Sequence, residues 1–201
     1  MADFPVARKT IISNALEIGY DMDLVIRLCQ YRTRPKTILS LLRGSVDRFT
    51  YGEIRRIYKD TTGESAPKGQ LPASAARIII TSDRRLHASH IAIKLKTYET
   101  GGFNLNNAEL HLRLYTNYLD EFEQTLDNAL LSFDHVYTIV RDLRIGDLTT
   151  IKCTDCRHHY INAVGSPISM HSCAVCNTLK SREAARVAGE NAKRKEQAAA
   201  V

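Results

Sequence analysis

The sequence lacks any run of about 18 consecutive apolar residues, which is the length that a helix needs to cross a bilayer. No long apolar stretch follows the first residues of the chain, so a secretory leader is not expected. We therefore expect a protein that stays in the cytoplasm, is not exported and has no membrane partner.

Several catalytic motifs are also absent. The chain has no Gly-x-Ser-x-Gly elbow, no His-Glu-x-x-His pair, no dinucleotide-binding glycine pattern and no deaminase-type His-x-Glu with Pro-Cys-x-x-Cys. The glycine- and proline-rich segment 61–72 is not a phosphate-binding Walker loop, because Lys68 precedes Gly69 instead of following it. We expect no enzyme, no catalytic residue and no small-molecule substrate.

Cysteine is scarce and its count is odd. With five cysteines, four of them spaced for a metal, a disulfide framework is not expected and a reducing compartment is. Cys29 lies on the apolar side of a helical pattern, where a buried thiol is the expected state. The other four form two C-x2-C pairs with sixteen residues between them, which is the spacing of a structural zinc site: Cys153, Cys156, Cys173 and Cys176.

Four thiolates would fill every position of the tetrahedron that Zn2+ prefers. No position is then left for a catalytic water, so we expect one structural Zn2+ and not a reactive one. His171 could replace one cysteine as a ligand. The centre would be negatively charged, and Lys152, Arg157 and His158 are close enough in sequence to stabilise it.

The positive charge is concentrated in one segment. The whole chain has a net charge of +6, whereas Arg27–Lys59 alone holds nine Lys or Arg against two acidic residues, a net charge of +7. Clustered arginines suit a phosphate backbone, although a solvated helix surface is the equally open alternative. The candidate DNA contacts are Arg34, Lys36, Arg43, Arg48, Arg55, Arg56 and Lys59. The basic tail after Lys180 is diluted by glutamates and is the weaker candidate.

The periodicity predicts a mainly α protein. Pro35 can begin a helix through Leu42, and Thr50 can cap another over 51–59 with Glu53 as the partner in a capping box. Helices are further predicted over 86–98 and as one long tract, capped by Asn104 or Asn106 and ended by Gly146. Extended segments at 148–151 and 160–164 enclose the first cysteine pair, as in a zinc ribbon.

Three parts follow from these patterns. We expect a helical domain for DNA binding and oligomerisation at 1–146, a four-cysteine zinc module at 147–180 and a basic, flexible tail at 181–201.

The segment from Ile54 to Pro72, IRRIYKDTTGESAPKGQLP, resembles a bacterial family, together with His87-Ala-Ser89 and the four spaced cysteines. That family is the flagellar transcriptional activator FlhC, and the resemblance runs in order from about residue 10 to residue 180. It implies a mainly helical protein whose four cysteines bind zinc. It further implies a hetero-oligomer with an FlhD-like subunit that binds promoter DNA and recruits RNA polymerase.

Residues and resemblance together predict a DNA-binding transcriptional activator of flagellar genes that works as a hetero-oligomer. Two regulatory alternatives stay open: a zinc-containing adaptor that docks a protein partner without touching DNA, and a diverged paralogue with another regulatory target. A zinc-dependent enzyme is the third alternative, and it would need an open metal position.

Overall fold

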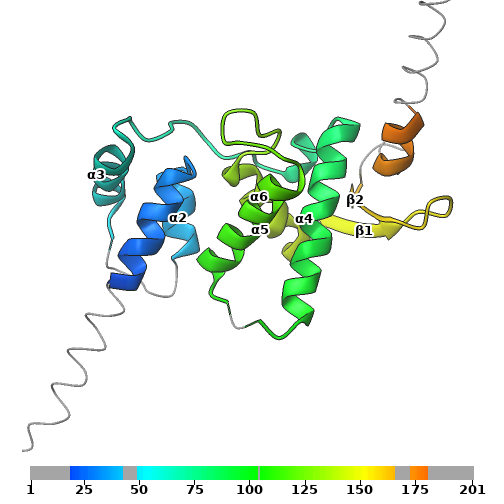
Figure 1. Cartoon of the computed structure of the whole chain (residues 1–201), viewed down its shortest axis with the longest axis horizontal. Helices are drawn as coiled ribbons and strands as arrows, with labels where there is room; N and C mark the ends of the chain where they lie inside the picture. Colours follow the sequence, from blue (N-terminus) through cyan, green and yellow to red (C-terminus); the bar gives the residue numbers. More distant parts are fainter. Residues whose placement is uncertain (1–18, 43–48, 104, 166–172, 181–201) are drawn as a thin grey trace, which may run out of the picture. The chain divides into compact units, whose positions relative to one another are not determined.

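The chain is mainly helical, as predicted, with one small sheet (Figure 1). The computed structural model describes residues 19–42, 49–103, 105–165 and 173–180. Among these residues, no helix combines the length and apolar character that crossing a membrane requires. In chain order the elements are a helical segment at 19–30, α2 (Pro35–Leu41), α3 (Tyr51–Thr62), the 3-10 turn η1 (Ala75–Arg77), α4 (Ser82–Thr100), α5 (Asn107–Glu121), α6 (Phe133–Ile145), strands β1 (Leu148–Lys152) and β2 (His159–Ala163), and a helical segment at 174–180.

Local capping sets the start of α3, as the sequence predicts. Thr50 Oγ1 accepts a hydrogen bond from the Glu53 backbone N–H at 3.2 Å, and Glu53 Oε2 accepts one from the Thr50 N–H at 2.7 Å. The helix is longer than predicted and ends at Thr62, because Gly63 adopts the left-handed conformation (φ 74°) that terminates a helix. Asn106 and Glu109 form a second capping box at the start of α5. Asn104 lies outside the described residues.

The single long helical tract predicted to end at Gly146 is wrong, because a loop at 122–132 separates α5 from α6. Tyr118 has a buried hydroxyl that accepts a hydrogen bond from the Leu131 N–H at 3.0 Å, and Gln124 Oε1 accepts one from the Leu130 N–H at 3.2 Å. These side chains accept hydrogen bonds from backbone N–H groups of the loop. In a helix, the same N–H groups would bond to carbonyl groups one turn earlier. Leu131 is fully buried, so the apolar spacing continues across a segment that is not helical.

Two compact units can be distinguished, and the division falls within α4 and α6. The first comprises Met1–Leu71 and Tyr98–Tyr137. Its core includes Tyr31, Tyr115 and Phe133, whose ring centroids lie 5.3 to 6.3 Å apart.

A buried carboxylate joins α2 to α6 within the first unit. Asp134, in the first turn of α6, accepts a hydrogen bond from Thr37 Oγ1 at 2.5 Å and pairs with Arg34 Nη1 at 3.6 Å. Burial raises the pKa of this carboxyl, and the partners from α2 oppose that shift. The polar contacts therefore compensate the cost of placing a carboxylate in the core.

The second unit comprises Pro72–Thr97 and Thr138–Val201. The segment with the four cysteines therefore belongs to the same compact unit as residues 72–97. Asp142 is completely buried and accepts hydrogen bonds from the Ala75 N–H at 2.6 Å and from Arg141 Nε at 2.8 Å. Arg141 Nη2 also donates to the Ala73 carbonyl at 2.8 Å. This network attaches the segment around η1 to α6. The three-part division made from the sequence stays a prediction.

The Asp142 network gives a stability prediction. We expect Asp142→Ala to lower the free energy of unfolding by about 3 kcal/mol, because it leaves a buried N–H and a partly buried guanidinium without their acceptor. Urea unfolding followed by circular dichroism measures the change. Asp147→Ala, at an exposed position, is the control and should change stability by less than about 0.5 kcal/mol. Equal effects of the two substitutions would contradict this role for Asp142.

Candidate metal centre

A tight turn between two strands positions the first cysteine pair. β1 and β2 pair antiparallel with Lys152 opposite His159, so the residues between them form the tip of a hairpin. The Cys153 N–H donates to the His158 carbonyl at 2.9 Å, and the Arg157 N–H donates to the Cys153 carbonyl at 3.1 Å. Arg157 takes a left-handed conformation (φ 61°) to close the turn. Cys153 and Cys156 are thereby held on the same tip.

A helical turn positions the second pair. Cys173 directly precedes the helical segment 174–180, and its carbonyl accepts a hydrogen bond from the Asn177 N–H at 3.0 Å. Residues three apart on a helical turn lie on the same side, so Cys176 joins Cys173.

The four sulfur atoms gather at distances suited to a tetrahedral metal. Cys153 Sγ lies 3.8 Å from Cys176 Sγ, and Cys156 Sγ lies 3.6 Å from Cys173 Sγ. All four Sγ atoms lie within 4.8 Å of one another. A zinc–sulfur bond of about 2.3 Å corresponds to a tetrahedral sulfur–sulfur edge of about 3.8 Å. The cysteines predicted from spacing are therefore brought together, and the donor set fits a thiophilic metal ion.

Backbone donors point at one sulfur of each pair. The N–H groups of Asp155 and Cys156 hydrogen-bond to the sulfur of Cys153, and those of Val175 and Cys176 hydrogen-bond to the sulfur of Cys173. The two pairs thus have the same local construction, although one lies in a hairpin and the other at a helix start. Such N–H donors stabilise a thiolate, as basic side chains beside the sulfurs would.

The pKa values of the thiols differ across the centre. Hydrogen bonding from the Cys156 backbone lowers the pKa of Cys153 to about 7. A hydrogen bond with the Cys156 side chain, followed by burial, raises the pKa of Cys176 to about 12. Four thiols in contact repel one another when ionised, and a divalent cation between them removes that repulsion.

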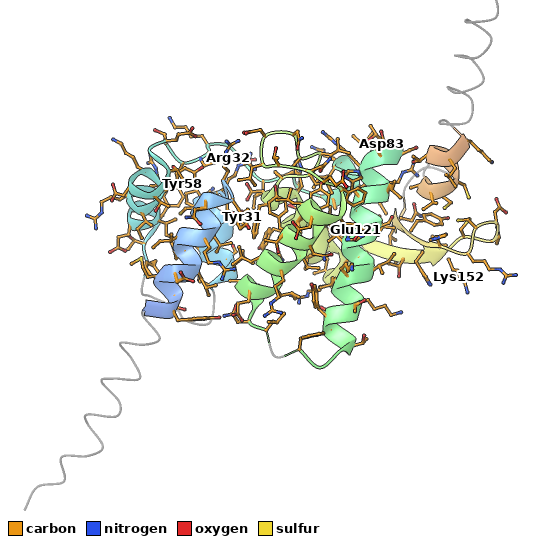
Figure 2. The ribbon with its side chains drawn as sticks, viewed as in Figure 1. Tyr31, Arg32, Tyr58, Asp83, Glu121 and Lys152 are labelled. Carbon is orange, nitrogen blue, oxygen red and sulfur yellow. The ribbon has the colours of Figure 1, made fainter. Side chains whose placement is uncertain are left out.

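The basic residues expected beside the sulfurs are all exposed. Lys152 lies at the end of β1 (Figure 2), and Arg157 and His158 follow in the turn. His158 Nδ1 lies 3.1 Å from the Cys156 carbonyl oxygen, a contact to the backbone of the turn.

One contact of α4 explains part of the His87-Ala-Ser89 motif. Ser89 Oγ accepts a hydrogen bond from the Ile161 N–H of β2 at 3.0 Å and donates to the Arg85 carbonyl at 2.6 Å. A serine hydroxyl can do both at once. The strand that carries the hairpin is therefore attached to α4 within the second unit. Local spacing could not reveal this contact, because it joins residues 72 positions apart.

No other cluster of metal ligands occurs in the described ranges apart from the four cysteines. His87 is buried in α4, where burial lowers its pKa, and His90 is half-buried. His171 lies outside the described residues. Cys29 is fully buried as predicted, and burial raises its pKa to about 11.

The predicted DNA contacts divide into exposed residues and residues used by the fold. Arg55, Arg56 and Lys59 are exposed on α3, whereas Ile54 and Tyr58 on the same helix are buried. Figure 2 shows Tyr58 on the side of α3 toward the rest of its unit.

Two further candidates, Arg34 and Lys36, lie at the start of α2. Lys36 is exposed, whereas Arg34 pairs with the buried carboxylate of Asp134 and so contributes to the fold. Arg43 and Arg48 lie outside the residues that the structure describes.

Sequence comparisons relate the chain to known proteins. A family model described as "Flagellar transcriptional activator (FlhC)" matches residues 6–190. Proteins named "Flagellar transcriptional regulator FlhC" are 30% identical over 130 residues in Thauera aminoaromatica (65% of this chain, 66% of the relative) and 30% identical over 141 residues in Verminephrobacter eiseniae (70% and 74%). A third, from Proteus mirabilis, is 24% identical over 172 residues (85% and 83%). The matched part is thus about two thirds of the length of the first relative and more of the other two.

The sulfur geometry leads to a prediction about metal content. We expect Cys153→Ser to release the metal ion and unfold the hairpin tip, because three thiolates bind a structural zinc far less tightly than four. Elemental analysis of the purified full-length chain measures the metal, and proteolysis measures the unfolding. Cys29→Ser, which removes the buried cysteine outside the cluster, is the control and should keep the wild-type metal content. A Cys153→Ser protein that purifies with the same metal content as the wild type would contradict the assignment.

Proposed function

This chain belongs to the FlhC family of flagellar transcriptional regulators, and on that premise we propose that it is a DNA-binding activator of flagellar genes. The family match, which extends over residues 6–190, supports a role in transcription regulation. The observation that carries DNA binding is the exposed cationic face of α3, formed by Arg55, Arg56 and Lys59. Guanidinium and ammonium groups that project into solvent from one helix can bind phosphates and displace condensed counterions.

The metal in this proposal is one structural Zn2+ bound by the four cysteines. Tetrahedral spacing and an all-sulfur donor set favour zinc over the oxygen-seeking cations. The ion would hold the hairpin tip to the start of segment 174–180, which is its contribution to the fold. X-ray absorption should find four sulfur neighbours and no oxygen. An oxygen neighbour would favour the zinc-enzyme alternative, which needs an open position.

The proposal includes the assembly that the resemblance to FlhC implies. We expect a hetero-oligomer with an FlhD-like subunit that binds double-stranded promoter DNA and recruits RNA polymerase, in the cytoplasm where these partners are found. The competing adaptor function would use the same zinc centre and basic helix to dock a protein. The two functions differ in one measurable property, which is specific affinity for DNA.

Fluorescence anisotropy tests the proposal directly. The full-length, zinc-loaded chain, alone and with the FlhD-like subunit, is titrated onto a flagellar promoter fragment and onto a scrambled fragment over a series of salt concentrations. We expect a preference for the promoter that persists as salt rises, because base contacts do not depend on counterion release. Equal affinity for both fragments, abolished by salt, would favour the adaptor or a paralogue with another target.

Charge reversal on α3 gives a sharper prediction. We expect the double variant Arg55→Glu, Arg56→Glu to weaken binding to every DNA sequence and to reduce the slope of log affinity against log salt by about 2. Both side chains are exposed, so stability should change little. Arg113→Glu, at an exposed arginine of α5, is the matched control and should keep most of the wild-type salt slope. Unchanged affinity and slope in the double variant would remove α3 from the DNA interface.

A further inference from the structure

A glycine lies on the cationic face of α3. At 100° per residue, positions 52 and 59 of the helix differ by only about 20° around the axis, so Gly52 and Lys59 lie on one line along it. Arg55 and Arg56 lie on either side of that line. All four residues are exposed, and the buried Ile54 and Tyr58 are on the other side of the helix.

Within the described part of the chain, nothing requires glycine at position 52. Gly52 is helical and does not have the positive φ that Gly63 has at the end of the same helix. Among the described residues, a Cβ atom built on Gly52 would meet Thr50 Oγ1 alone, at 4.0 Å, which is an ordinary van der Waals distance. Alanine would therefore fit, and it is the better helix former. The missing side chain leaves the first turn of α3 open on the line of Lys59, and such a position lets a partner outside the chain approach the backbone closely.

The end of α3 is already occupied by its own residues. The side chains of Thr50 and Glu53 cap it, and the Glu53 carboxylate lies where an end-on anion would bind. An external phosphate backbone would therefore meet the side of the helix.

We propose that α3 lies side-on in the major groove of DNA, with the line of Gly52 and Lys59 facing the groove and the missing side chain at Gly52 letting the first turn approach the duplex. The major groove is about 12 Å wide and admits an α-helix. Arg55 and Arg56 then project to the two sides, where phosphates and base edges are within reach. This inference rests on the proposed DNA-binding function and adds the element and the face that enter the groove.

A side chain added at position 52 should lower the affinity for DNA without lowering the stability of the protein. We expect Gly52→Ala and Gly52→Gln to leave the Tm of the full-length chain unchanged or raise it by about 1 to 3 °C, because both residues are better helix formers than glycine. Affinity for promoter DNA should fall with side-chain size, by about 10-fold or more for Gly52→Gln. The larger residue holds the helix farther from the duplex.

Gly19 provides a matched control. It is also exposed and helical, and a Cβ atom there would meet nothing within 4 Å. Gly19→Ala and Gly19→Gln should change Tm in the same direction and leave DNA affinity at the wild-type value. Binding is measured by anisotropy with the FlhD-like subunit present and absent, and assembly with that subunit is measured separately by sedimentation.

The outcomes distinguish the inference from the function it rests on. If Gly52→Gln binds promoter DNA as well as the wild type while charge reversal at Arg55 and Arg56 weakens binding, the groove placement is overturned and DNA binding stands. If Gly52→Gln loses assembly with the FlhD-like subunit but its affinity for DNA is unchanged, the face serves a protein partner. Failure of the wild-type protein to prefer promoter DNA would overturn the proposed function and this inference with it.

Discussion

Four sulfur atoms of the second unit lie within 4.8 Å of one another, at distances that suit a tetrahedral metal ion. Cys153 and Cys156 lie on a hairpin tip, whereas Cys173 and Cys176 lie at the start of a helical segment, so two different local structures have to present the same pair geometry. In each pair, backbone N–H groups hydrogen-bond to the sulfur of the first cysteine. The hairpin is in turn attached to α4 through Ser89. A metal bound there would stabilise all of these elements together, because its ligands come from both ends of the segment.

Buried carboxylates have a comparable role in each unit. Asp134 joins α2 to α6 in the first, and Asp142 joins the η1 segment to α6 in the second. Each takes a basic residue as a partner, so part of the positive charge of the chain is used inside the fold. Other basic residues stay exposed, and Arg55, Arg56 and Lys59 on α3 are among them. Charge location is therefore more informative about function than net charge.

α3 combines a buried face and an exposed cationic face on one short helix. Its buried side packs through Ile54 and Tyr58, and its capping box stabilises its start without any partner molecule. Its exposed side carries a glycine and three cations, of which Lys59 lies in the last turn, where a positive charge favours the helix dipole. A preformed cationic helix also loses little conformational entropy when it binds.

The sequence by itself determined the features that depend on neighbours a few residues away. The capping box at Thr50, the helix begun by Pro35, the two strands around the first cysteine pair and the metal-ligand spacing all follow from short-range stereochemistry, which acts wherever the pattern occurs. Only the tertiary structure decided that the apolar tract after Asn106 breaks into α5 and α6, because the hydroxyl of Tyr118 and the amide of Gln124 satisfy the loop between them. It likewise decided that Arg34 pairs with Asp134 while Arg55 stays exposed, since an ion pair between residues 100 positions apart leaves no trace in local spacing.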